Sequence, residues 1–202
     1  MFQTFPSERC ERIREEFHVT KRLRFLIAAL AAAPVAVFGQ GSAPAPDNPI
    51  SDSEKHVYAM LSSVVIAAAE KMPEESYSFK PTPEVRSFGQ LVGHLADSNY
   101  FFCSTAAGET KPSDVEKSKT KKADLVAALK EAVSYCNKTY AGMTDAKGSQ
   151  MTKMMNFDMA KLTVLAGNFA HNYEHYGNMV TYMRIRGIVP PTSEKGSSPG
   201  QN

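Results

Sequence analysis

The stretch MAKLTVLAGNFAHNYEHYGNMVTYMRIR, residues 159–186, decides the fold class. Its apolar residues recur every three or four positions, which is typical of a helix that turns one face toward a protein core. The apolar arc consists of Leu162, Leu165, Phe169, Tyr176, Val180 and Met183. Asp158 is a candidate N-cap, and Gly187 followed by Pro190-Pro191 prevents the helix from continuing. The stretch therefore predicts one long amphipathic helix.

Three further stretches have helical periodicity and their own start or stop signals. They are residues 51–72, 87–107 and 125–140. The first two open with capping-box patterns, Ser51 with Glu54 and Ser87 with Gln90, and the second is followed by Gly108. No stretch predicts a strand convincingly. We therefore expect an all-α four-helix bundle whose loops of about a dozen residues can cross one end of the bundle.

The N-terminal segment, residues 1–39, has the features of a signal peptide. A basic run at 21–24 precedes a mostly apolar run at 25–38, and small residues around 39–42 fit cleavage before Gln40. We expect an exported protein, periplasmic or secreted, with no stable membrane insertion after cleavage; an uncleaved anchor is the alternative. The polar preface at residues 1–18 is unusually long, so a second hypothesis is that the start of the chain is over-extended.

The remaining domain boundaries follow from composition. Residues 40–50 are rich in proline and small residues and predict a linker, residues 51–191 the bundle, and residues 192–202 a disordered polar tail. Residues 1–39 hold six Lys/Arg and four Asp/Glu of the chain's 23 and 21, so the remainder carries 17 of each sign. This balance argues against nucleic-acid binding, which needs clustered positive charge.

Three histidines form the candidate metal site. His171 and His175 are four residues apart, so on a helix they lie on one face, one turn apart, and one ion can bind both. His94 supplies a third ligand if its helix packs beside theirs. Three neutral imidazoles with an open fourth position suit a divalent metal, with zinc or nickel favoured. The candidates for holding the second ring nitrogens are Asp97, Asn168, Glu174 and Asn178. Purely structural histidines are the alternative.

Three segments of the chain resemble the DinB/YfiT-like superfamily. They are FGQLVGHLAD at 88–97, HNYEHYGNMVTY at 171–182 and RGIVPP at 186–191, and the resemblance spans about residues 51–193. It implies a four-helix bundle, commonly dimeric, in which His94, His171 and His175 bind a divalent metal. Some relatives are thiol-dependent transferases or isomerases, and others have no known activity.

Two functions remain open at this point. The first is a metal-dependent hydrolase or transferase that acts on an unknown small molecule at the open position of the ion. The alternative is a non-catalytic metal-binding or stress-related bundle whose ion only holds helices together. Export argues against thiol transfer, because low-molecular-weight thiols are abundant in the cytoplasm.

The other chemistry-bearing residues receive structural interpretations. Cys103 lies about 180° around its helix from His94, so it cannot share the same ion and belongs in the core. If the helices of Cys103 and Cys136 form an adjacent hairpin, the two residues differ in height by about 15 Å, so we expect no disulfide between them. His56 is expected at the surface, with a role as an acid or base as the alternative.

Overall fold

The computed structural model describes residues 47–194 of the 202-residue chain. The predicted signal peptide at 1–39, most of the predicted linker at 40–50 and residues 195–202 of the predicted tail lie outside the described residues. Within 47–194, no helix has both the length and the apolar composition needed to cross a membrane.

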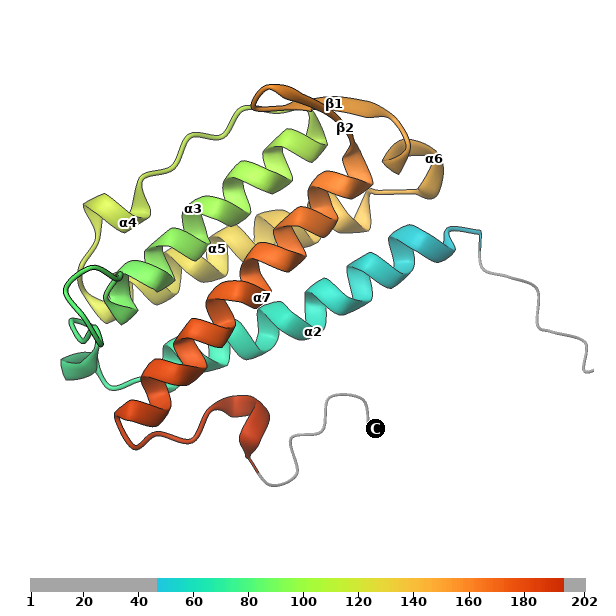
Figure 1. Cartoon of the computed structure of the whole chain (residues 1–202). Coiled ribbons are helices and arrows are strands. Elements are labelled where there is room, and N and C mark those ends of the chain that lie inside the picture. The colour runs from blue at the N-terminus through green and yellow to red at the C-terminus, as the bar shows by residue number, and fades with distance from the viewer. Residues whose placement is uncertain (1–46, 195–202) are drawn as a thin grey trace, which may run out of the picture. The chain divides into compact units, whose positions relative to one another are not determined.

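Four long helices account for most of the described chain, as predicted (Figure 1). They are α2 (Pro49–Lys71), α3 (Phe88–Ala107), α5 (Lys122–Ala141) and α7 (Lys161–Ile185). Helix α3 packs against α5 and α7, and α2 packs against the same two helices. The short elements are η1 (Glu74–Ser76), α4 (Val115–Ser118), α6 (Asp145–Gly148), β1 (Met151–Met154), β2 (Phe157–Ala160) and η2 (Pro191–Ser193).

Helices α3 and α5 run in the same direction, because residues 108–121 return along α3 before α5 begins. Helix α4, inside this connection, packs against α3. The start of α5 therefore lies beside the end of α2, where the Lys122 ammonium donates to the carbonyl of Glu70 at 2.7 Å. The end of α7 lies beside the start of α3, where the Tyr182 hydroxyl donates to the Arg86 carbonyl at 2.9 Å. Helices α2 and α7 thus run opposite to α3 and α5.

The parallel arrangement of α3 and α5 corrects the prediction about the cysteines. Cys103 and Cys136 form a disulfide, with their Cα atoms 5.3 Å apart, and both residues are fully buried. The predicted height difference assumed an antiparallel hairpin and was wrong. Because the helices run in parallel, Cys103, 15 residues beyond the start of α3, lies level with Cys136, 14 residues beyond the start of α5.

The two predicted capping boxes have different outcomes. The box of Ser87 and Gln90 is confirmed at the start of α3. At α2 the prediction was wrong, because the helix already begins at Pro49, and Ser51 lies inside its first turn. There the carboxylate of Asp145 accepts hydrogen bonds from the backbone N–H and the hydroxyl of Ser51, at 2.7 and 2.8 Å. A residue from α6 therefore satisfies the free N–H groups of this helix.

A β-hairpin replaces the predicted beginning of the last helix. Strands β1 and β2 pair antiparallel through a two-residue turn, Met155-Asn156, in which Met155 has a φ of 51°. Asp158 consequently lies in β2, and α7 starts at Lys161. The hairpin could not be predicted from the sequence, because its turn lacks the Asn-Gly or Asp-Gly pair that is typical of such loops. A hydrogen bond from the Thr152 hydroxyl to the Thr105 carbonyl, 3.1 Å long, fixes the hairpin to the end of α3.

The end of the described chain folds back onto α7. Gly187, with a φ of 75°, lies just beyond the helix end, as predicted. The hydroxyls of Tyr176 and Thr192 are hydrogen-bonded at 3.0 Å, and Arg184 donates to the Ser193 hydroxyl at the same distance. The first residues of the predicted tail, Thr192 and Ser193, are therefore exposed but hydrogen-bonded to α7.

Candidate metal centre

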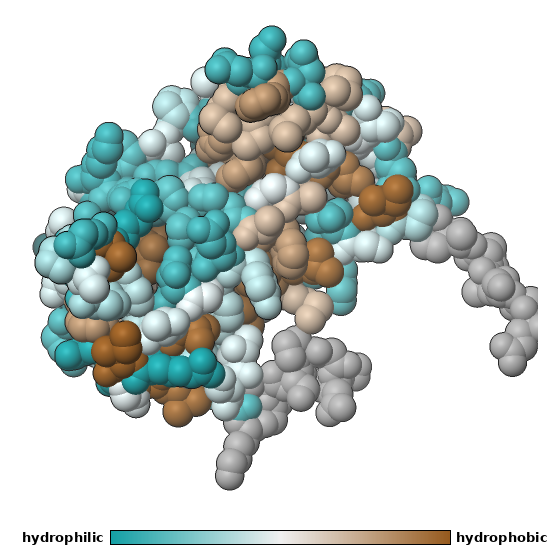
Figure 2. All heavy atoms as spheres, in the orientation of Figure 1, coloured by the Kyte–Doolittle hydropathy of each residue, from teal (hydrophilic) through white to brown (hydrophobic). Residues whose placement is uncertain are grey.

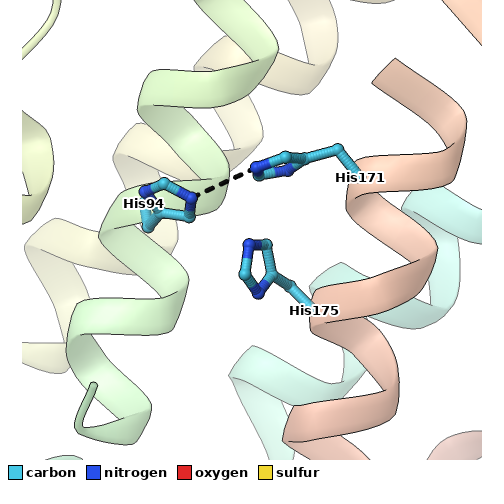
Figure 3. A group of neighbouring side chains, drawn as sticks. All are labelled: His94, His171 and His175. Carbon is cyan, nitrogen blue, oxygen red and sulfur yellow. Dashed lines mark hydrogen bonds between the residues drawn. The ribbon is translucent and has the colours of Figure 1, made fainter. Parts of the chain in front are cut away.

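The three histidines lie together between α3 and α7 and point toward one another (Figure 3). His94 comes from the first half of α3, and His171 and His175 come from successive turns of α7. One nitrogen from each ring can be chosen so that all three lie within 4.8 Å of one another. These side chains could hold one metal ion, and α7 places two of them there simply by its helical repeat.

Two of the donor atoms have the separation expected of ligands on a first-row divalent ion. The Nε2 atoms of His94 and His171 are 3.2 Å apart. Ligand atoms on a tetrahedral zinc, at about 2.0–2.1 Å from the ion, lie roughly 3.3 Å from one another. His175 has its Nδ1 3.4 Å from the side-chain nitrogen of Asn178, which leaves its Nε2 for the centre of the group. The pair of His94 and His171 therefore has the spacing of two ligands on one ion, and the chosen nitrogen of His175 lies within 4.8 Å of both.

The electrostatic surroundings keep two of these rings neutral. Burial, followed by the neighbouring imidazoles of His175 and His94, lowers the pKa of His171 to about 4. Burial and the adjacent His94 likewise lower the pKa of His175 to about 4. At neutral pH both rings therefore present the lone pair that a metal requires.

Glu116 is a functional candidate that sequence reasoning missed. Its Oε2 lies 3.1 Å from Nδ1 of His94, and its Oε1 accepts from Nε of Arg86 at 2.9 Å. A carboxylate on the outer nitrogen of a ligand histidine fixes the tautomer and orients the ring. Glu116 is 22 residues from His94 and lies in a polar connection without periodicity, so no signal in the sequence connected the two.

Asp97 positions helix α4, which carries Glu116, against α3. Its carboxylate accepts from the backbone N–H groups of Val115 and Glu116, at 2.8 and 3.0 Å, and from the hydroxyl of Ser113. These bonds hold the start of α4 against α3. A Cβ on Gly93 would lie 2.7 Å from the Cα of Glu116, so glycine is required there for this close approach. Asp97 and Gly93 together place Glu116 beside His94.

The remaining predicted supporting residues lie in different surroundings. The side chain of Asn178 contacts His175, as described above, and Glu174 is exposed on α7. Asn168 is fully buried, and its side chain bonds with Asn99 at 3.2 Å and with Asn172 at 2.9 Å. These hydrogen-bonded amides connect α7 to α3 next to the three histidines.

Two further residues bear on the predictions for this site. His56 is exposed on α2 and does not belong to the three-histidine group. Cys103 lies in the disulfide and not at the histidines, as its position around α3 predicted.

Replacing Glu116 tests its assignment. We expect Glu116→Ala to lower the affinity of the three histidines for Zn²⁺ by roughly 10- to 100-fold, because His94 loses the acceptor on its outer nitrogen. Isothermal titration calorimetry with Zn²⁺ measures the change in affinity. Glu174→Ala is the matched control, because it removes the same charge from an exposed position near His171. A larger loss in Glu174→Ala than in Glu116→Ala would contradict the assignment.

Cavities open on two sides of the histidines. One, of about 850 Å³, is lined by His94 and His171 together with the end of α3, residues 108–113 and the β1–β2 hairpin. The other, of about 610 Å³, is lined by His175 and mostly polar residues from 80–90 and α7. A small molecule can therefore approach the group from solvent, a property that distinguishes catalytic from closed structural sites.

Comparison with known proteins identifies the family. The model of the DinB superfamily matches residues 60–179, which is more than half of the chain and includes all three histidines. The chain belongs to the DinB superfamily. Comparison with curated proteins finds no match.

Two crystal structures of DinB-like proteins share the fold of this DinB-superfamily chain. One, from Bacillus cereus ATCC 10987, has a TM-score of 0.63 and 14% identity, and the alignment covers 69% of this chain and 95% of that one. The other, from Bacillus subtilis, has a TM-score of 0.55 and 19% identity, with 67% and 92% covered. The predicted family resemblance is confirmed, and DinB proteins are often metal-binding.

Proposed function

We propose that this chain is an exported DinB-type four-helix bundle that binds one divalent ion, zinc or nickel, through His94, His171 and His175. We further propose that it is a hydrolase or transferase acting on a small molecule. The observation that carries the proposal is the convergence of three imidazoles within 4.8 Å at the wall of an 850 Å³ cavity.

Each part of the centre has a role in this proposal. Neutral imidazoles favour zinc, nickel and other borderline ions over calcium or magnesium. A bound ion would act as a Lewis acid on an oxygen or sulfur atom of the substrate. Glu116 holds the outer nitrogen of His94, and Arg86 holds Glu116 in turn. The cavity admits the substrate at the side of His94 and His171.

The disulfide supports export. Bonds such as Cys103–Cys136 form and persist in oxidising compartments, whereas cytosolic proteins keep their thiols reduced. The basic and apolar runs at 21–38 support the same conclusion independently. A periplasmic or secreted location makes hydrolysis or another group transfer a better proposal than transfer to a cytoplasmic thiol. A homodimer stays a prediction from the family resemblance.

A structural ion is the second candidate, because the three histidines connect α3 to α7. Such an ion would stabilise the packing of the two helices without taking part in a reaction. It would need no access from solvent, so the two cavities beside the histidines favour the catalytic candidate.

Metal analysis combined with a Co²⁺ spectrum tests the proposal. We expect the purified chain to contain about one divalent ion per molecule, and acetohydroxamate to change the visible spectrum of the Co²⁺-loaded protein, because a bidentate ligand enters the open position. A chain that binds no divalent ion in stoichiometric amount overturns the proposal. A chain that binds Co²⁺, unfolds on chelation and shows no spectral response supports the structural alternative.

A further inference from the structure

The larger cavity beside His94 and His171 has an apolar wall that begins at the histidines themselves. The rings of Phe102 and His171 have their centroids 5.6 Å apart, and the Phe101 ring packs on Phe102 at 5.4 Å. Met154 and Met155 line the same cavity from the hairpin. Phe101 is 42% exposed and Met155 67% exposed, and their place in one cavity makes this apolar surface informative. Figure 2 shows hydrophobic side chains gathered over the hairpin end of the molecule.

Most polar side chains of this cavity are already engaged within the protein. The hydroxyl of Ser98 donates to the His94 carbonyl at 2.6 Å, and that of Thr105 to the Phe101 carbonyl at 2.7 Å. The Thr152 hydroxyl is held by its bond to the end of α3, and the Asp97 carboxylate by the start of α4. These groups shape the cavity, but none has an uncommitted hydroxyl donor to offer a ligand.

The charged residues of the cavity are balanced and are engaged as well. Its lining holds two carboxylates, Asp97 and Glu109, and two ammonium groups, Lys111 and Lys153. The ammonium of Lys111 lies over the rings of Tyr100 and Tyr135, at 5.0 and 5.3 Å. Glu109 accepts from the Tyr135 hydroxyl at 2.7 Å, and Lys153 lies 4.0 Å from Asp158. The side chains of the cavity therefore carry no net charge, so the part of a substrate that lies away from the ion meets no surplus charge there.

We propose that the substrate carries an uncharged aryl or similarly flat apolar group next to the atoms that reach the ion. This inference rests on the proposed function. The apolar group packs on Phe101 and Phe102 under the methionines of the hairpin, and the polar end reaches His94 and His171. A cavity of about 850 Å³ is of the size that holds a drug-sized ligand. Its apolar wall then provides specificity, and the ion provides orientation.

Three hydroxamates that share one metal-binding end but differ in the attached group test this inference. Acetohydroxamate carries a methyl group, benzohydroxamate a phenyl ring and succinomonohydroxamate a carboxylate. We expect Co²⁺-loaded protein to bind benzohydroxamate about ten-fold more tightly than acetohydroxamate, because the ring removes apolar surface from water. The succinate compound should bind no better than acetohydroxamate. Titrations followed through the Co²⁺ spectrum give the three dissociation constants.

Variants of Phe101 show whether the preference for benzohydroxamate comes from the aromatic wall of the cavity or from the ion. Phe101→Ser should reduce the preference for benzohydroxamate to about two-fold and leave acetohydroxamate binding unchanged, whereas Phe101→Leu should keep part of the preference. Tyr173→Ser is the control, because Tyr173 is an exposed aromatic residue on α7 outside this cavity. We expect it to behave as the parent.

The outcomes distinguish the two proposals. If all three hydroxamates leave the spectrum unchanged, the proposal of an accessible metal centre is overturned, and the proposed substrate class is overturned with it. If they bind but benzohydroxamate has no advantage, or if the carboxylate compound binds best, the substrate class alone is overturned. A preference that Phe101→Ser leaves intact also overturns it, because the ring must then bind elsewhere.

Discussion

Replacement of His171 with alanine is expected to lower the affinity for Zn²⁺ by roughly two to three orders of magnitude. Four-ligand zinc sites in small domains gain about 10–16 kcal/mol, so one protein ligand corresponds to about 3–4 kcal/mol. His171 forms a nearly equilateral triangle with the other two rings, with centroid distances of 5.0 Å to His94 and 4.5 Å to His175, which are themselves 4.8 Å apart. Its loss leaves two ligands on different helices. Competition with a chromophoric chelator measures the affinity of parent and variant.

The control for this prediction is His56→Ala. His56 is exposed on α2, so its removal changes the histidine content without touching the three-histidine group. We expect this variant to bind Zn²⁺ as the parent does. Far-ultraviolet circular dichroism of the metal-free variants establishes that both are folded. If His171→Ala is folded and binds Zn²⁺ as tightly as the parent, the three-histidine centre is wrong.

The sequence predicted the three histidines because their signals are local or follow from one simple condition. The spacing of His171 and His175 places them on one helix face whatever the rest of the fold does. His94 needed only that its helix pack beside α7, which it does. Glu116 could not be found in this way, since its approach depends on how residues 108–121 return along α3. A supporting residue that lies in a connection between helices, as Glu116 does, has no periodic sequence pattern that would reveal it.

The same distinction explains which helix ends were predicted. Ser87, Gln90 and Gly108 act within their own turns, and the structure has them as predicted. Ser51 also looked like a local cap, but Asp145, 94 residues away, provides the carboxylate that satisfies this helix end. Asp158 lost its predicted role because the hairpin formed around it. Local capping chemistry can be read from sequence, whereas capping by a distant residue cannot.

The direction of α5 was the most consequential feature that the sequence left open. Loops of about a dozen residues allow either an antiparallel neighbour or a return to the starting end, and the apolar periodicity of α5 is the same in both cases. The contacts of Lys122 and the pairing of Cys103 with Cys136 show the return. Two residues predicted to lie too far apart are therefore joined by a covalent bond between the parallel helices.

Removal of this disulfide is expected to have the largest effect on stability. For a bond that closes a separation of 33 residues, the loss of chain entropy in the unfolded state predicts about 4 kcal/mol. For the double variant Cys103→Ala and Cys136→Ala we expect a fall of about 10 °C in the midpoint of thermal unfolding. Calorimetry or circular dichroism measures it. Zn²⁺ affinity should change by less than about three-fold, because the bond lies on the opposite side of α3 from His94.

Reduction of the disulfide in the parent protein separates the contribution of the covalent bond to stability from that of the two cysteine side chains. If the bond carries the effect, parent protein with dithiothreitol should unfold near the temperature of the double variant, and the reductant should leave the variant itself unchanged. A variant with Cys10→Ser gives the measurement a chain in which Cys103 and Cys136 are the remaining cysteines. Titration of free thiols in unreduced, unfolded protein should give none. Two titratable thiols per chain would show that the helices are not joined, and would also remove the support that the bond gives to export.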